Sequence, residues 1–241
     1  MTSPVLPAEP VGRVVFATAT LSFVGGFVDV VGFIALFGLF TAHVTGNFIM
    51  LGLEMVHATK LAIAKLLAVP IFIVMVALTR LFVLHYEKKG ESPSREMLLA
   101  QAALLACFMI AGGMTTPHED PNDLGPVVAG LLGVMAMAVQ NAGSRLILAN
   151  HGPATMMTGN TTQAVIDLVD LLRGLPEETP QARKRLKLLV PSILAFTVGA
   201  LLGALSYVTF SFWCLIIPIV ALLAVTAMVA TRPHLAGGEG I

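Results

Sequence analysis

The sequence predicts an all-α polytopic membrane protein with six transmembrane helices in 3+3 inverted repeats. A short re-entrant or interfacial helix is expected after the first span of each repeat. The 241 residues include only 14 Lys and Arg and 14 Asp and Glu, while 56% are hydrophobic. A soluble chain would carry about twice that charged fraction. Several apolar stretches reach the roughly 20 residues that cross a bilayer, and a polar motif occurs twice.

The apolar stretches give six spans. Val14 to Phe40 contains a single charge, and Met97 to Pro117 and Leu124 to Ser144 contain none. Leu188 to Thr231 runs for 44 residues without a charge, which is about 66 Å of helix and twice a ~30 Å hydrocarbon core. This stretch must form two spans, with a turn near Ser206 to Trp213. The expected spans are residues 13–38, 61–84, 96–115, 125–148, 187–207 and 211–230.

The polar motif indicates an internal duplication. Thr45-Gly46-Asn47 returns 113 residues later as Thr158-Gly159-Asn160. A carboxylate lies seven residues after each Asn and a base thirteen residues after it: Glu54 and Lys60, then Asp167 and Arg173. Three residue types at equal spacing are hard to obtain by chance. Repeat one therefore covers about 13–115 and repeat two about 125–230.

The basic residues predict the orientation. Six spans place both termini on one side, and that side collects every Lys and Arg except Lys60 and Lys65. The positive-inside rule makes this side cytoplasmic. Because each repeat has three spans, the second enters from the opposite face, as is common in secondary carriers. We expect a disordered cytoplasmic leader over 1–12, a single transmembrane domain over 13–232 and a cytoplasmic tail over 233–241.

Each motif precedes a helix, over 41–59 and 155–172, that is too short to cross. Thr and Asn are good N-cap residues, and Gly permits a tight break. One face of each helix is polar and the remaining faces are apolar. The polar positions are Asn47, Glu54 and His57 in the first helix, and Asn160, Asp167 and Asp170 in the second. The helices lie either in the membrane interface or as re-entrant half-helices.

The two placements have different consequences for function. In the re-entrant case the positive helix start would attract an anionic or strongly dipolar ligand. The plain alternative is a capped turn at the start of a loop. A capped turn alone does not require a second copy with the same acid, which favours a functional motif. His43 could couple to protons, but its counterpart is Met156, so the repeat does not require this role.

Two further polar sites fall within spans. Asp29 is beyond the midplane, about 24 Å along the first span from Arg13. A lone carboxylate at this depth faces a cavity, a partner or a proton path, or is protonated and bonded to a neighbour. Gly25, Gly26 and Gly32 flank it, so another backbone could approach here. Gln140-Asn141 is the matching place in span four, and suits either a second gate or a buried hydrogen-bonded pair.

Other functional classes find little support in the sequence. Cys107 and Cys214 lie within spans and are expected to be packing residues rather than a disulfide or metal pair. No hydrolase, zinc-protease or paired-aspartate motif is present. We therefore expect no enzyme activity, no catalytic residue, no metal, no cofactor and no nucleic-acid partner.

The residues also resemble a known family. The patterns Gly25 to Phe33 and His43 to Asn47 are similar to those of the YoaK family of bacterial membrane proteins, and Gln140-Asn141 and Met157 to Asn160 resemble its second half. The resemblance covers nearly the whole chain. It implies a bacterial inner-membrane protein of about six helices and supplies no mechanism, because the family is a domain of unknown function.

Two functions compete at this point. The first is a small secondary carrier or exporter of a small polar or anionic solute, with Asp29 as the coupling acid and the two motifs holding substrate. The second is a non-transporting scaffold or regulator whose Gly-rich helices pack into an oligomer such as a homodimer. A water-accessible path to Asp29 would separate them.

Overall fold

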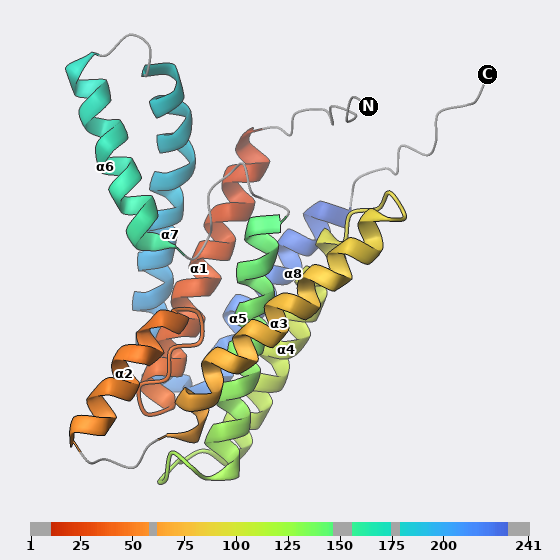
Figure 1. Cartoon of the computed structure of the whole chain (residues 1–241), viewed down its shortest axis with the longest axis vertical. Helices are drawn as coiled ribbons and strands as arrows, with labels where there is room; N and C mark the ends of the chain where they lie inside the picture. The colour runs from red at the N-terminus through yellow and green to blue at the C-terminus, as the bar shows by residue number, and fades with distance from the viewer. Residues whose placement is uncertain (1–10, 58–61, 147–155, 175–178, 231–241) are drawn as a thin grey trace.

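The fold consists of long and short helices. The computed structural model describes residues 11–57, 62–146, 156–174 and 179–230, and within them every regular element is a helix (Figure 1). In chain order these are α1 (Val11–Ala35), α2 (Val44–His57), α3 (Ile63–Glu87), α4 (Ser94–Thr115), α5 (Leu124–Leu146), α6 (Met157–Arg173), α7 (Thr179–Phe210), the 3-10 helix η2 (Ser211–Leu215) and α8 (Ile216–Ala230). The predicted leader and tail lie outside the described residues, except that Val11 and Gly12 already belong to α1.

Five stretches are long and apolar enough to cross a membrane: α1, α3, α4, α5 and the 50-residue run Pro180–Val229. This last run is divided at Ser211, whose φ of 51° breaks the α-helix. The break falls inside the region where the sequence predicts a turn. Figure 1 shows the chain running down α7, turning at η2 and returning along α8. The chain is therefore a multi-pass membrane protein.

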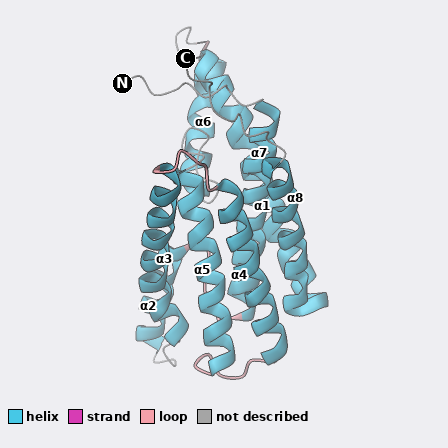
Figure 2. Ribbon diagram, turned by 90° about the vertical axis from the view of Figure 1, so that its right-hand side faces the viewer, coloured by secondary structure: helices cyan, strands magenta, loops and turns pink. Residues whose placement is uncertain are grey.

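α1 is the central helix. It packs along α7 and also contacts α8, α5 and η2, and Val24, Phe27, Val28 and Val31 are fully buried. α3 lies at the edge against α5, and Figure 2 shows α3, α5 and α4 side by side. The start of α1 and the end of α8 lie at one end of the molecule, here called the terminal end (Figure 1). We call the opposite end the far end.

Glycines bring the backbones of α1 and α7 into direct contact. A Cβ added at Gly26 would lie 2.2 Å from the Phe196 carbonyl oxygen, and one at Gly199 would lie 2.2 Å from the Phe23 carbonyl oxygen. No side chain fits such a distance. Close approach through small residues is how helices associate where lipid removes the hydrophobic drive. The expectation that a backbone could approach beside Asp29 is met here by α7.

The two helices run parallel, which shows how far α7 extends. The Cβ of Gly203 would lie 2.8 Å from the Phe27 carbonyl oxygen. The three carbonyl contacts thus join residues 176, 176 and 170 positions apart (199 − 23, 203 − 27 and 196 − 26), a mean of about 174. By that offset the start of α1 at Val11 is level with about residue 185 of α7. The helical residues 179–184 therefore project about 9 Å beyond α1. The sequence predicts this span only from residue 187, but the helix begins at Thr179, because Pro180 is tolerated in a first helical turn.

The far end is closed by an aromatic cluster. The Phe212 ring makes edge-to-face contacts with Phe108, Tyr207 and His118, at centroid distances of 5.5, 5.6 and 5.7 Å. His118 belongs to the loop between α4 and α5, and its Nε2 is buried without a hydrogen-bond partner among the described residues. Burial lowers the pKa of His118, and the nearby Asp123 charge offsets this in part. Burial therefore favours the neutral form of the His118 imidazole at this position.

The glycine contact predicts a clear mutational effect. Gly199→Ala should lower the unfolding temperature and cost about 1–3 kcal/mol, because the added methyl forces α1 and α7 apart. Gly52→Ala is the matched control, since nothing lies within 4 Å of a Cβ there and Ala favours the helix. Thermal unfolding in detergent would measure both. Equal effects of the two substitutions would contradict a backbone contact at Gly199.

A second prediction concerns pH. Because the pKa of His118 is lower in the folded protein than its ordinary 6.5, the unfolded chain binds the proton first as pH falls. Stability should be full above about pH 6.5 and fall below it. His118→Phe should remove this part of the pH dependence, as followed by unfolding temperature between pH 5 and 8. An unchanged pH profile in the variant would assign the effect to another group.

Candidate functional site

A line of buried polar side chains follows one face of α1. Thr18, Ser22 and Asp29 are spaced by four and seven residues, which places them on the same helical face, and their exposed fractions are 1, 0 and 7%. The Thr18 hydroxyl donates to the Val14 carbonyl at 2.8 Å. The Ser22 hydroxyl has no partner among the described residues. This polar stripe covers about 16 Å of the helix.

Asp29 holds the connection to α2 in place. Its Oδ1 accepts backbone N–H groups from Thr41 and Ala42, both at 2.8 Å, and a longer one from His43 at 3.4 Å. The Thr41 hydroxyl donates to the same oxygen at 3.3 Å. Within the described part of the chain its Oδ2 accepts no hydrogen bond. The carboxylate therefore replaces water for a buried, non-helical stretch of backbone.

Glycines on two helices receive the returning segment. A Cβ at Gly32 of α1 would lie 2.7 Å from the Thr41 methyl, and one at Gly133 of α5 would lie 2.9 Å from the same methyl. Thr41 is fully buried. The returning chain is thus wedged between α1 and α5, at the level of Asp29.

The motif asparagines have a structural role that the sequence did not predict. Asn47 Oδ1 accepts the Phe40 N–H at 2.9 Å, and Asn47 Nδ2 donates to the Phe40 carbonyl at 2.8 Å. One side chain thus satisfies both backbone groups of a residue. Asn160 is similarly buried, at 5% exposed. The N-cap expectation is wrong for α6, because its cap is Met156 and makes no side-chain capping bond.

The remaining motif residues differ in exposure. Gly46 is buried, and a Cβ there would meet the Phe40 ring at 2.6 Å. Thr45, Thr158 and Gly159 are exposed. His43 is also exposed.

The acids that follow the two motifs, Glu54 and Asp167, each form an ion pair. Glu54 of α2 bonds to Lys65 of α3 and also accepts the Ala62 N–H at 3.1 Å. Asp167 of α6 accepts Nη2 of Arg185 of α7 at 2.6 Å and its Nε at 3.0 and 3.1 Å.

Each short helix is thereby tied to the next long helix. Of the bases at the repeat spacing, Lys60 lies outside the described residues, and Arg173 ends α6 while Asp167 pairs with Arg185 instead. The hydrogen bonds from Arg185 hold the pKa of Asp167 below its ordinary value. The Asp167 carboxylate therefore remains charged at neutral pH.

A pair of glutamine side chains links three long helices by hydrogen bonds. The Gln101 amide of α4 donates to Gln140 Oε1 of α5 at 2.6 Å, and Gln140 Nε2 donates to the Leu21 carbonyl of α1 at 2.9 Å. Both glutamines are buried. The neighbouring Asn141 donates to the Met137 carbonyl in its own helix at 3.0 Å. Gln140 therefore touches the helix that carries the polar stripe.

The short helices begin at opposite ends of the polar stripe, and we call them the two half-helices. α2 follows directly from the segment bonded to Asp29 and runs toward the far end. The pair Asp167–Arg185 sets antiparallel α6 and α7 in register, so Thr158 is level with about residue 194 of α7. By the parallel offset of about 174, this is level with about residue 20 of α1, between Thr18 and Ser22. α6 runs from there toward the terminal end. In Figure 1 both half-helices start near mid-height and diverge.

Sequence reasoning identified only part of this arrangement. Asp29, His43 and Thr45-Gly46-Asn47 are brought together, and Thr158-Gly159-Asn160 begins the other half-helix. It missed Thr18 and Ser22, whose helical spacing to Asp29 was a usable signal, and Gln101. Among the described residues no three His, Cys, Asp or Glu side chains gather as a metal site would require.

The enclosed ion pair predicts a large loss of stability. Lys65→Met leaves the buried Glu54 carboxylate without its counterion, since the side chains are 2 and 10% exposed. We expect a cost of about 3–5 kcal/mol. The surface pair Arg80–Glu87, at 43 and 50% exposed, is the control, and Arg80→Met should cost about 0–1 kcal/mol. Unfolding in detergent measures both, and a Lys65→Met variant as stable as Arg80→Met would refute the pairing.

Comparison with known proteins places the chain in a family. Residues 17–228 match the family model described as "Protein of unknown function (DUF1275)". No curated protein matches the chain, and no solved structure does. The match covers all the helices that carry the polar stripe and the half-helices. The chain therefore belongs to the DUF1275 family of proteins of unknown function.

Proposed function

We propose that this protein is a small secondary carrier that moves a small polar or anionic solute across the bacterial inner membrane. One observation carries the proposal: two half-helices begin at opposite ends of a buried polar stripe on α1. Helix starts present free N–H groups and a partial positive charge. Solute between them would meet favourable groups from both sides, as in carriers with discontinuous helices.

The 3+3 inverted repeat is part of the proposal, and the helix packing supports it. If α1, α2, α3 and α4 are exchanged with α5, α6, α7 and α8, the main contacts are preserved. The contact of α1 with α7 corresponds to that of α5 with α3. The contact of α4 with α5 corresponds to that of α8 with α1, and the contact of α2 with α3 to that of α6 with α7. The acid of each half-helix also pairs with a base near the start of the next helix. Such exchange is what a twofold axis in the membrane plane requires.

Basic residues support an orientation with both termini in the cytoplasm. The start of α7 carries Arg183, Lys184 and Lys187, all exposed. The loop between α3 and α4, which carries Lys88 and Lys89, lies at the same end of the molecule (Figure 1). The positive-inside rule assigns that end to the cytoplasm. Asp29 then lies on the outer side of the membrane centre.

Asp29 is the residue we assign to coupling. One oxygen is fixed by backbone N–H groups, and its Oδ2 accepts no hydrogen bond from described residues, which leaves it for a proton or cation. Intramembrane carboxylates of this kind mark ion and proton paths. Gln140 and Asn141 occupy the inner half and would form the opposite gate. No enzyme activity is part of the proposal.

A scaffold or regulatory protein is the second candidate, and one observation favours it. Asp29, Asn47 and Gln140 all bond to protein backbone. Polar side chains used in this way can serve to hold the fold without any solute. Transport measurements separate the two functions.

The experiment is transport by purified protein in liposomes under proton and sodium gradients, across a panel of small anions and polar metabolites. Asp29→Asn keeps an oxygen for the N–H groups of Thr41 and Ala42 but removes the charge, so it should fold yet reduce coupled transport about tenfold. Ser22→Ala should also slow it.

The matched control is Thr197→Ala, an exposed α7 hydroxyl bonded to its own helix, which should transport normally. Wild-type liposomes that move no solute, or an Asp29→Asn variant with unchanged coupling, would rule out the carrier and leave the scaffold.

A further inference from the structure

The outward face of α6 carries a continuous exposed stripe. Five residues repeat at alternating spacings of three and four, and we call them the α6 seam: Thr158, Thr161, Val165, Leu168 and Leu172. All five are exposed, with values of 55, 50 and 80% for the last three. Alternating threes and fours give the seam along which paired helices interlock.

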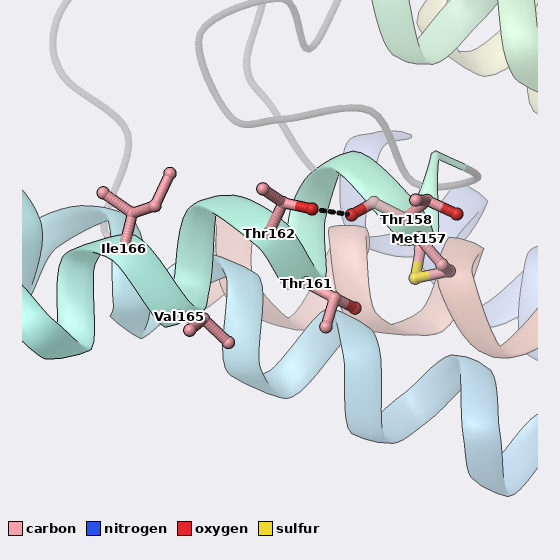
Figure 3. Close-up of a pocket in the computed structure, with 6 residues that line it drawn as sticks. All are labelled: Met157, Thr158, Thr161, Thr162, Val165 and Ile166. Atoms are coloured by element: carbon pink, nitrogen blue, oxygen red, sulfur yellow. Dashed lines mark hydrogen bonds between the residues drawn. The ribbon is translucent and has the colours of Figure 1, made fainter.

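The seam contains an open groove. It has a volume of about 650 Å³ and is lined by Met157, Thr158, Thr161, Thr162, Val165 and Ile166. Figure 3 shows two rows of side chains along α6, one with Thr161 and Val165 and the other with Thr162 and Ile166. Rows at a spacing of four are ridges, and a second helix packs its own ridge between them. The Thr162 hydroxyl donates to the Thr158 carbonyl at 2.9 Å, which leaves its methyl group for packing.

The seam crosses the membrane boundary. Thr158 is level with about residue 194 of α7, roughly 9 Å past Leu188, where the apolar part of that helix begins. Leu172 lies near the opposite end of the half-helix, beside the basic start of α7. Lipid tails can therefore cover the first part of the seam but not Leu172, which is 80% exposed. Any occupant of the whole seam must pass from hydrocarbon into water along the same line.

Charge also restricts the occupant. The flanking positions Thr162, Ala164, Val169 and Leu171 are uncharged, whereas the exposed bases of this region lie off the seam, at Arg173 and on α7. A second copy of α6 therefore meets no like charge directly across the seam. Small Thr residues within the membrane permit close approach, and Val and Leu outside it supply apolar area.

We propose that the α6 seam is the interface through which two copies of this chain associate side by side. Symmetry about an axis along the membrane normal places two α6 helices in the same direction, so each passes the boundary at the same level. The interface does not depend on whether the protein transports.

Disulfide trapping tests the register. In a Cys107→Ser background, with the buried Cys214 kept, single cysteines would be placed at Val165, Leu168 and Leu172, and controls at Asp170 on the same helix and Leu201 on α7. Oxidation in native membranes should yield dimers of twice 25.3 kDa at least tenfold more at seam positions than at the controls. Equal yields at all positions, no dimer, or a conjugate of another mass would overturn the proposal.

A second measurement guards against misfolding of a variant. Wild-type protein in nanodiscs should have the protein mass of two chains, and Leu168→Glu with Leu172→Glu should have the mass of one. Both substituted residues are exposed, so the unfolding temperature of the separated chain should remain measurable and cooperative. A wild-type mass of one chain would overturn the interface directly.

Discussion

The chain breaks between α1 and α2 beside Asp29, and the rest of the structure depends on how the backbone groups of this break are satisfied. In hydrocarbon each unpaired N–H or carbonyl costs several kcal/mol. The chain ends α1 at Ala35, turns, and returns to the level of Asp29. The carboxylate there accepts the N–H groups of Thr41 and Ala42, and Asn47 satisfies both groups of Phe40. Two side chains thus satisfy the backbone groups just before the half-helix α2 begins.

That solution reverses the usual amphipathic pattern. In a soluble protein the apolar face of a helix is buried, but here Asn47 and Glu54 of α2 face the protein while Ile49 and Val56, at 75 and 81% exposed, face outward. Lipid is an apolar solvent, so the apolar face needs no protein cover. The polar face, by contrast, must be buried and paired. The position of the half-helices at the edge of the bundle follows from this.

Local signals in the sequence predicted much of this structure. Run lengths and the bilayer thickness predicted every long helix and the turn at Ser211, because these depend on one segment and its solvent. The repeated motif predicted both half-helices, but not that Asn47 and Asn160 are buried.

The sequence did not predict the partners. Lys60 and Arg173 matched by spacing, yet the acids pair with Lys65 and Arg185, which reach them only after the chain folds back. Equal spacing along the chain does not determine which residues pair, because an ion pair depends on tertiary geometry. The helical start of α7 was missed for a related reason. The charges at the start of α7 indicated a segment exposed to solvent. The sequence alone did not show that α6 packs against this segment.

Both ion pairs join a carboxylate to a base, but the bases differ in solvent exposure. This difference bears on which half-helix moves more easily. Lys65 is 2% exposed, whereas Arg185 is 40% exposed. Opening the first pair would strand a charge in a low-dielectric place and cost several kcal/mol. Opening the second lets water hydrate the guanidinium at once, although Asp167 must also move because it is fully buried. Water therefore lowers the cost of moving α6 more than that of moving α2, so the two half-helices differ in rigidity although each is held by an ion pair.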